Sequence, residues 1–203
     1  IIVVINYMLK KLLCAVLVPL TYCYNFDLCV VGATSGLGNE LIYRCIKDAK
    51  KKVLALSYSK NSKICVPYRK NTFNYANTEE FKNDDLLIES YWSHIPYTYD
   101  NIVFCTGAKP FQDDYSDILM EKFLNNLPEN CKNVALVSAY GVGDSIENAN
   151  LGIQVMNDLY LKDVYRAKNY QEKALNNYQG DVNKLIYRPK ALSYGKTLLD
   201  STS

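Results

Sequence analysis

The sequence predicts an α/β fold, a doubly wound parallel sheet, in a single domain. From Phe26 onward, short apolar runs alternate with longer polar segments of helical period, which is the pattern of a parallel sheet with helices on its faces. A glycine-rich turn, GATSGLG, joins the first apolar run to the first amphipathic segment. A chain of 203 residues is long enough for one domain with a sizeable core and too short for two ordinary enzyme domains.

Five apolar runs are predicted to be strands of this sheet because they are short and rich in β-type residues. They cover residues 28–31, 53–56, 102–105, 134–138 and 184–187. A further strand is expected at 64–66 or at 72–75. Between these runs, residues 37–50, 84–93, 117–127 and 159–177 place their apolar side chains on one helical face and are predicted to be helices.

Charge and cysteine content exclude several classes of protein. The 23 basic and 21 acidic residues give a net charge of +2, so nucleic acid is not an expected partner. The seven cysteines have neither the paired spacing of a zinc site nor the even number of a disulfide framework, and we interpret them as buried structural thiols. With one histidine in the chain, neither a metal site nor a Ser/His/Asp arrangement is predicted.

The first 24 residues have two interpretations. Lys10 and Lys11 follow Met8 and precede an apolar run at 12–20, which is the layout of a signal peptide. Residues 8–24 are therefore either a leader or an extra element packed on the domain. The run is too short to span a bilayer comfortably, so no stable membrane span is expected. A leader indicates export or an organelle, whereas unpaired cysteines indicate a reducing interior, and cytoplasmic and organellar locations both stay open.

The glycine-rich turn is the main functional signal. Gly32, Gly36 and Gly38 lie where a predicted strand ends and a predicted helix begins, and Thr34 and Ser35 add hydroxyl donors. Glycine permits the tight turn and lets backbone amides approach a pyrophosphate, while the helix N-terminus supplies a favourable dipole. A dinucleotide site is therefore predicted, and the alternative is that the glycines serve the shape of the turn alone.

The end of the second predicted strand indicates which dinucleotide is bound. A carboxylate there would bind the ribose 2′-hydroxyl of NAD, and a basic side chain would accept the 2′-phosphate of NADP. The stretch SYSKNSK after residue 56 contains no carboxylate. NADP is therefore favoured, with Ser57 and Lys60 as the contacts of its 2′-phosphate. NAD is the alternative cofactor. The other interpretation is that this stretch is a solvated basic loop that binds no cofactor.

These motifs resemble those of the short-chain dehydrogenases/reductases. GATSGLG has the Gly-x-x-x-Gly-x-Gly spacing of that family, VFCTGA (103–108) is similar to the strand end that borders its cofactor, and ALVSAYGVGDS (135–145) to the strand end that carries its serine. YRAKNYQEKAL (165–175) and LIYRPKALSYG (185–195) resemble the helix and strand end of the atypical, NAD(P)-binding branch, which includes flavin and biliverdin reductases and NmrA-like regulators. The resemblance covers residues 26–195 and implies a Rossmann fold.

The resemblance also implies roles for individual residues. The phosphate loop would be formed by Gly32, Thr34, Ser35, Gly36, Leu37 and Gly38. Gly107 and Ala108 would line the cofactor, and Ser138 would lie beside the nicotinamide. Lys168 would hold the ribose hydroxyls, and Arg188 would fix the strand end near the nicotinamide.

The chain departs from the family pattern at two places that concern catalysis. Conventional members have Tyr-x-x-x-Lys, in which the tyrosine exchanges a proton with the substrate, but here Tyr165 lies three residues before Lys168. The difference is about 100° of helical rotation, so Tyr165 is either a proton donor or a packing residue at the rim.

Glu172 is expected to form a helical ion pair with Lys168. The chain also ends eight residues after Gly195, so a short or truncated substrate region is expected.

Together these features predict an NAD(P)H-dependent oxidoreductase of the atypical type, which transfers hydride to an unidentified small molecule. The catalytic candidates are Ser138, Lys168 and Tyr165. The nicotinamide carries the hydride chemistry, so the displaced tyrosine does not exclude an enzyme. For Ser138 the alternative is a strand-end hydroxyl that caps a turn. For the protein the alternative is a non-catalytic NAD(P)-binding regulator or scaffold that acts on a protein partner.

Overall fold

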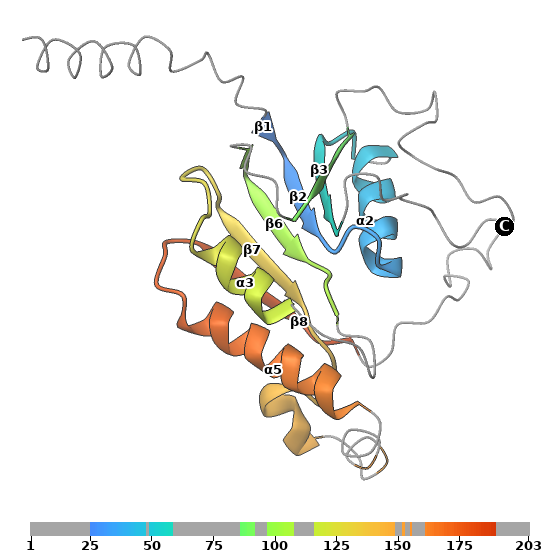
Figure 1. Ribbon diagram of the computed structural model, residues 1–203, viewed down its shortest axis with the longest axis vertical. Coiled ribbons are helices and arrows are strands. Elements are labelled where there is room, and N and C mark those ends of the chain that lie inside the picture. The colour runs from blue at the N-terminus through green and yellow to red at the C-terminus, as the bar shows by residue number, and fades with distance from the viewer. Residues whose placement is uncertain are drawn as a thin grey trace, which may run out of the picture.

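The centre of the computed structural model is a six-stranded sheet in which every neighbouring pair of strands is parallel (Figure 1). The structure describes residues 25–47, 49–58, 86–91, 97–107, 116–148, 152, 155 and 161–189. The order of strands across the sheet is β4 (Leu86–Ser90), β3 (Val53–Ser57), β2 (Leu28–Val31), β6 (Asn101–Phe104), β7 (Asn133–Val137) and β8 (Asn183–Tyr187).

The direction in which the sheet is built reverses at the β2–β6 pair. From β2 the chain builds outward to β3 and β4, and it then returns to the other side of β2 and builds outward through β6, β7 and β8. Cys29 accordingly pairs with Leu54 on one side and with Ile102 on the other. This is a doubly wound sheet, so the predicted fold class is confirmed. In such sheets ligands bind at the carboxyl ends of the strands, at the point of reversal.

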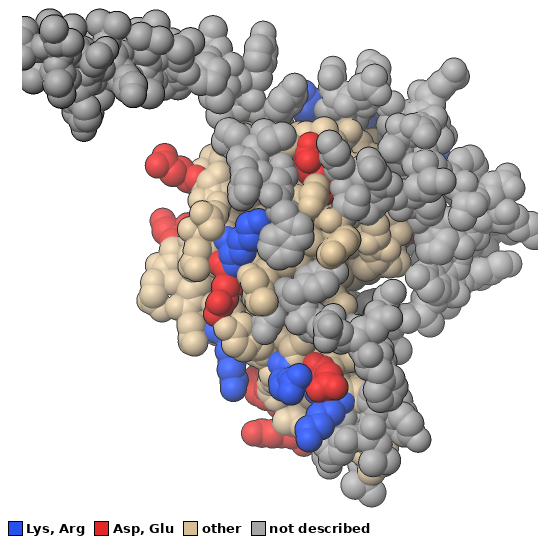
Figure 2. All heavy atoms as spheres, viewed as in Figure 1, with Lys and Arg blue, Asp and Glu red and all other residues tan. Residues whose placement is uncertain are grey.

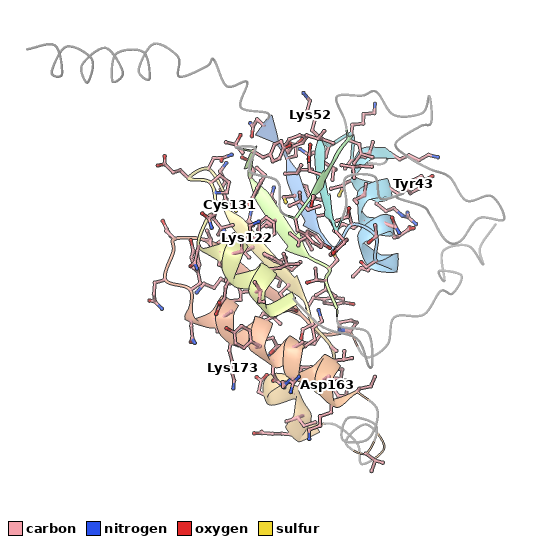
Figure 3. All side chains as sticks on the ribbon, in the orientation of Figure 1. Tyr43, Lys52, Lys122, Cys131, Asp163 and Lys173 are labelled. Atoms are coloured by element: carbon pink, nitrogen blue, oxygen red, sulfur yellow. The ribbon has the colours of Figure 1, made fainter. Side chains whose placement is uncertain are left out.

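Helices cover the two faces of the sheet (Figure 1). Helix α2 (Gly36–Lys47) packs on one face, where Ile42 and Ile46 join Val30 of β2 in a buried cluster. Helices α3 (Ser116–Leu124) and α5 (Lys162–Asn177) pack on the other face, where the core includes Leu119 and Leu175. Figure 3 shows this division, with Tyr43 on α2 and Lys122 on α3. Successive strand residues alternate between the two clusters, as the period of a strand requires.

Three short elements complete the described part of the chain. Strands β1 (Asn25–Phe26) and β5 (Thr98–Tyr99) pair in parallel. Each is followed, after one residue, by a strand of the main sheet: β1 by β2, and β5 by β6. A 3-10 helix, η2 (Gly143–Asn148), follows β7. Because η2 lies between β7 and α5 in the chain, it begins at the carboxyl edge of the sheet.

All five strands predicted from apolar runs are confirmed, with ends that differ by no more than one residue. The helices predicted at 37–50, 117–127 and 159–177 correspond to α2, α3 and α5. Helix α2 is shorter than predicted because the backbone turns after it, with Lys50 at a φ of 51°. The strand expected at 64–66 or 72–75 lies outside the described residues, as do the expected leader and the C-terminal substrate region.

The helix predicted at 84–93 is wrong. Residues Leu86–Ser90 form β4, which pairs with β3 along its whole length. Leu86 and Ile88 pack with the cluster beneath α2, whereas Leu87 packs with the cluster on the opposite face. Both faces of β4 are therefore used, and a short apolar run of this kind cannot be assigned to helix or strand by its period alone.

Candidate functional site

The glycine loop between β2 and α2 is packed closely against the neighbouring strand end. A side-chain carbon on Gly32, whose φ is +90°, would lie 2.7 Å from Thr106 N. A side-chain carbon on Gly38 would lie 2.9 Å from Ser35 Oγ and would clash with the carbonyl oxygen of Gly32. Packing alone therefore requires glycine at these two positions. Gly36 is half-buried at the first residue of α2, where the predicted phosphate contact would be made.

The other loop residues divide between structural and exposed roles. Ser35 caps the start of α2, because its Oγ accepts a hydrogen bond of 2.9 Å from Gly38 N. That bond does not use the hydroxyl hydrogen of Ser35, which can still be donated to a ligand. Thr34 is exposed, and Leu37 packs against the buried cluster beneath α2.

The structure at the end of β3 does not test the predicted preference for NADP over NAD. Ser57 is completely buried, and Tyr58 after it is exposed. The backbone oxygen of Ser57 accepts a hydrogen bond of 2.8 Å from Tyr91 N. Lys60, the basic candidate for the 2′-phosphate, lies outside the described residues. A fully buried Ser57 is a poor direct ligand for a solvated phosphate, so the predicted preference for NADP depends mainly on Lys60.

The end of β6 lies against Lys168 of α5. Gly107 is exposed, and a side-chain carbon there would lie 3.9 Å from Lys168 Cε. Ala108, the other predicted cofactor contact on this strand end, lies outside the described residues. The structure therefore brings Gly107 and Lys168 together, and the contacts of both residues with a cofactor stay predictions.

Ser138 follows the last residue of β7 and is 5% exposed. Its backbone N–H donates to Tyr187 O at 2.8 Å, but its hydroxyl has no hydrogen-bond partner among the described residues. The structure therefore does not support the alternative in which this hydroxyl caps a turn. An unsatisfied buried hydroxyl costs about 1–3 kcal/mol, and it is the kind of group that a bound ligand satisfies.

Lys168 is buried, with its ammonium group at the carboxyl edge of the sheet. Its Nζ donates to the carbonyl oxygens of Thr106 and Val137, the latter at 2.7 Å. It also donates to Gln171 Oε1 at 3.1 Å. The ammonium thus connects the segments that follow β6 and end β7.

Tyr165 lies one turn before Lys168 on α5 and is half-buried. Its hydroxyl donates a hydrogen bond of 3.0 Å to the carbonyl oxygen of Tyr140. Burial raises the pKa of Tyr165, so the hydroxyl keeps its proton at neutral pH. This differs from the conventional arrangement, in which a neighbouring ammonium favours tyrosinate.

Arg188 joins three elements after the end of β8. Its guanidinium forms a bidentate pair with Glu172 of α5, with Nε to Oε1 and Nη2 to Oε2 both at 2.8 Å. Its Nη1 lies 2.7 Å from Asp144 Oδ1 of η2. Hydrogen bonding to Glu172 raises the pKa of Arg188 further. The ion pair expected between Glu172 and Lys168 is therefore corrected: Glu172 pairs with Arg188, because α5 turns this carboxylate toward the end of β8.

The residues of α5 that face this edge follow the helical repeat. Tyr165, Lys168, Asn169 and Glu172 are spaced at i, i+3, i+4 and i+7, and Asn169 Oδ1 accepts a hydrogen bond of 2.9 Å from Gly143 N. The motifs did not reveal Gln171, Asn169 or Asp144. The sequence could have indicated Asn169, because it shares a helical face with Tyr165 and Glu172. Polar residues at this spacing indicate that the face makes polar contacts.

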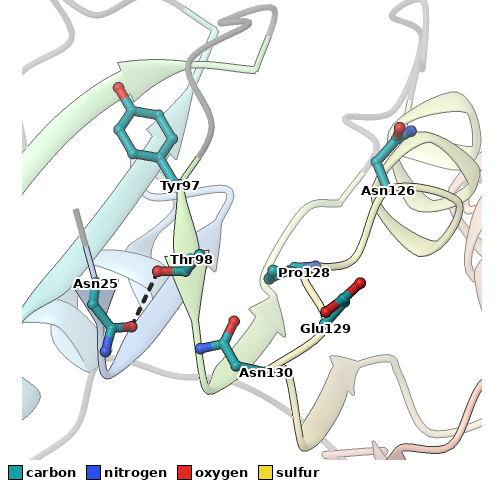
Figure 4. Close-up of a pocket in the computed structure, with 7 residues that line it drawn as sticks. All are labelled: Asn25, Tyr97, Thr98, Asn126, Pro128, Glu129 and Asn130. Carbon is teal, nitrogen blue, oxygen red and sulfur yellow. Dashed lines mark hydrogen bonds between the residues drawn. The ribbon is translucent and has the colours of Figure 1, made fainter. Parts of the chain in front are cut away.

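A separate hollow lies at the opposite, amino edge of the sheet (Figure 4). Its volume is about 710 Å³, and it is lined by Asn25, Tyr97, Thr98, Asn126, Pro128, Glu129 and Asn130. Thr98 Oγ1 donates to Asn25 Oδ1 at 3.2 Å across one wall. None of the predicted site residues lines this hollow, so the carboxyl edge stays the candidate site.

Acidic and basic residues are interspersed on the face seen in Figure 2. Arg44 pairs with Glu40 at 2.9 Å, and Arg166 pairs with Asp163 at 3.1 Å. Within the described part of the chain, no group of three or more His, Cys, Asp or Glu residues could hold a metal ion. No helix of that part is long and apolar enough to cross a membrane.

Comparisons with known proteins bear on the fold. No protein-family model and no curated protein matches the chain. Among solved structures, the oxidoreductase YlbE from Lactococcus lactis has a TM-score of 0.56 and 14% identity, over 84% of this chain and 72% of its own. ChuY, an anaerobillin reductase from Escherichia coli O157:H7, has a TM-score of 0.55 and 14% identity, over 80% and 71%. A short-chain dehydrogenase/reductase from Veillonella parvula, in complex with NADP, has a TM-score of 0.52 and 13% identity, over 80% and 69%.

At these identities the comparisons show the fold. The chain has a doubly wound Rossmann fold, as these three solved structures do. The resemblance predicted from the motifs is confirmed at that level, and the roles of the individual site residues stay predictions.

Proposed function

We propose that this chain binds NADP(H) at the carboxyl edge of the sheet and reduces a small molecule, as an oxidoreductase of the atypical short-chain dehydrogenase/reductase type. The observation that carries the proposal is the hydroxyl of Ser138, which is buried and has no hydrogen-bond partner within the described part of the chain. It follows Val137, whose carbonyl oxygen accepts from Lys168. A donor of this kind, held next to a buried ammonium group, suits the oxygen atom of a carbonyl substrate.

The residues present fit a dinucleotide. Gly36 and the N-terminus of α2 would hold the pyrophosphate, and the exposed Gly107 would lie along the cofactor. Lys168 would bind the ribose hydroxyls, and Arg188 would keep the end of β8 in place through Glu172 and Asp144. When bound, the nicotinamide supplies the hydride. NADP is preferred in this proposal because Lys60 follows β3 and no carboxylate does so in the stretch SYSKNSK.

The protein groups would orient the substrate and manage its proton. Ser138 would donate a hydrogen bond to the substrate oxygen, which polarises the bond to be reduced. Tyr165 keeps its proton because burial raises its pKa, so it is in the correct state to donate one. To do so it must exchange the carbonyl oxygen of Tyr140 for the substrate. The outcome of Tyr165→Phe therefore separates a proton donor, whose loss lowers kcat, from a packing residue, whose loss does not.

A second candidate function, a non-catalytic NAD(P)-binding regulator or scaffold, is favoured by a different observation. The Tyr165 hydroxyl is already bonded to the chain, and the Lys168 ammonium already has three acceptors. A site whose proton donor and ribose ligand are both engaged suits a protein that senses the cofactor and passes its state to a partner.

The first experiment is calorimetric titration of the full chain with NADPH, NADH and their oxidised forms, repeated on Gly36→Asp. Micromolar NADPH binding that is lost in the variant would support the cofactor site. The next experiment is a reductase panel that follows NADPH consumption. Turnover that disappears in the Ser138→Ala, Lys168→Ala double variant would support the enzyme. Cofactor binding with no turnover would favour the regulator, and binding of none of the four nucleotides would exclude both proposals.

A further inference from the structure

Strands β6 and β7 separate at their carboxyl ends. Their pairing ends with Phe104 opposite Leu136. Beyond that point Cys105 N donates to Val31 O of β2 at 2.7 Å, whereas Val137 pairs with Tyr187 of β8. The segment after β6 therefore stays beside β2, and the end of β7 stays beside β8. The carbonyl oxygens of Thr106 and Val137 consequently have no β6–β7 ladder partner.

The ammonium group of Lys168 spans this separation. It donates to the carbonyl oxygens of both Thr106 and Val137. A lysine side chain is flexible, and holding its charged end at one place costs conformational entropy. A third contact that restricts the ammonium therefore bears directly on how well Lys168 is preorganised for a ligand.

Gln171 supplies that third contact. It is completely buried, one turn after Lys168 on α5, and its Oε1 accepts from Lys168 Nζ at 3.1 Å. Its Nε2 donates to Thr106 Oγ1 at 3.1 Å. These two bonds fix the direction of the amide, with oxygen toward the ammonium and nitrogen toward the hydroxyl. A buried amide is tolerated only when its hydrogen bonds are made, so these two bonds stabilise Gln171 in this orientation.

We propose that Gln171 is a positioning residue, which holds the Lys168 ammonium between the ends of β6 and β7 and thereby sets the affinity for the nicotinamide ribose. The second half of this statement rests on the proposed function. Gln171 does not touch the cofactor in this proposal, because it acts through Lys168. Thr106 contributes through its hydroxyl, which orients the Gln171 amide.

The first test measures the position of the ammonium without any cofactor. A buried, hydrogen-bonded lysine ammonium exchanges its protons slowly with water and is observable by ¹⁵N-edited NMR, and loss of a signal in Lys168→Met identifies it. In Gln171→Met, which keeps the side-chain length and removes both hydrogen bonds, we expect exchange to be at least about tenfold faster. Gln171→Glu keeps an acceptor for Lys168 and should preserve the signal, as should Gln179→Met, a matched change at an exposed glutamine. An unchanged signal in Gln171→Met would overturn the proposal.

The second test compares two probes. NADPH contains the nicotinamide ribose, whereas 2′,5′-ADP does not. Gln171→Met should weaken NADPH binding about tenfold and leave 2′,5′-ADP binding within about twofold, since only NADPH uses Lys168. Gln171→Glu should bind NADPH as the native protein does. Equal losses for both probes would show a general structural defect and would overturn the ribose role. Thr106→Val supplies an independent variant, with a smaller loss in the same direction, if Gln171→Met does not fold.

A chain that binds neither probe would overturn the proposed function and, with it, the ribose role. The ammonium signal would still decide whether Gln171 positions Lys168, so the two failures are distinguishable.

Discussion

Two serines after β7 differ in whether their hydroxyls are hydrogen-bonded. Ser138 Oγ is buried without a partner among the residues that the structure describes. Ser145 Oγ accepts from Gly141 N at 2.9 Å and donates to Val142 O at 2.6 Å. The first hydroxyl therefore lowers the stability of the ligand-free protein, and the second increases it.

The two serines accordingly give opposite predictions. Ser138→Ala should leave the free energy of unfolding unchanged or raise it by up to about 1 kcal/mol, because it removes an unsatisfied group. Ser145→Ala, the matched control, should lower it by about 1 kcal/mol, because two hydrogen bonds are lost. Urea unfolding of both variants measures the difference. Equal destabilisation would mean that the Ser138 hydroxyl has a partner in the protein.

Arg188 offers a second comparison at the scale of single residues, because it binds two carboxylates of different burial. The Glu172 side chain is 4% exposed, and that of Asp144 is 81% exposed. Glu172→Gln should lower the free energy of unfolding by about 2–3 kcal/mol, since a buried charge pair is broken. Asp144→Asn removes the same charge from an exposed pair and should cost less than about 0.5 kcal/mol. Thermal unfolding tests this, and similar losses would contradict it.

At the scale of elements, the glycine loop combines two requirements that the structure separates. Gly32 and Gly38 have no room for a side chain because strand and helix approach closely. Gly36 begins α2 and is half-buried. The sequence showed the three glycines as one motif, and the packing identifies Gly32 and Gly38 as the two that shape the loop. For Gly36 the phosphate contact stays a prediction.

Substitutions in the loop should reflect this separation. Gly38→Ala should destabilise the protein by about 3 kcal/mol or more, because its side-chain carbon would clash with backbone that cannot move easily. Gly36→Asp places a carboxylate at a helix N-terminus, where it is electrostatically favourable, so the free energy of unfolding should change by less than about 1 kcal/mol. NADPH binding should nevertheless be lost, since the carboxylate repels a phosphate. A strongly destabilised Gly36→Asp would instead assign Gly36 to the shape of the loop.

Helix α5 and strand β4 show what motifs can and cannot indicate about an element. The Lys-x-x-x-Glu and Arg-Pro motifs were predicted to belong to one site, and the bidentate pair of Glu172 with Arg188 is the contact that joins them. The partner assigned to Glu172 was wrong because the helical spacing to Lys168 is only one of several contacts that a helix permits. For β4 the period was ambiguous, and pairing with β3 decided the conformation.

At the scale of the whole molecule, burial of ionisable groups makes stability depend on pH. Burial raises the pKa of the Cys29 thiol and of Tyr99. It raises the pKa of Cys105 to about 12, although nearby Lys168 lowers it in part. In the unfolded chain a thiol has a pKa of about 8.5, the value in model peptides. Between these values the folded protein retains protons that the unfolded chain has lost.

Unfolding therefore releases protons above about pH 8.5, and the free energy of unfolding should fall as the pH rises, by up to about 1.4 kcal/mol per pH unit for each buried thiol. Urea unfolding from pH 7 to pH 10 measures this slope. Cys29→Ala and Cys105→Ala should each make the slope shallower, whatever they do to stability at pH 7. A slope that neither variant changes would mean that these thiols do not titrate as their burial requires.

The local features of this protein follow from the sequence alone: the alternation of apolar runs and amphipathic segments, the glycine turn between the first strand and helix, and the positions of Ser138 at a strand end and Lys168 within a helix. Each depends on residues that are close in the chain. Three contacts became visible in the folded protein: β4 joins the sheet, Lys168 spans the ends of β6 and β7, and Arg188 binds Glu172 and Asp144. Lys168 and Thr106 are 62 residues apart, and no local period specifies a contact over that separation, because it depends on how strands and helices pack.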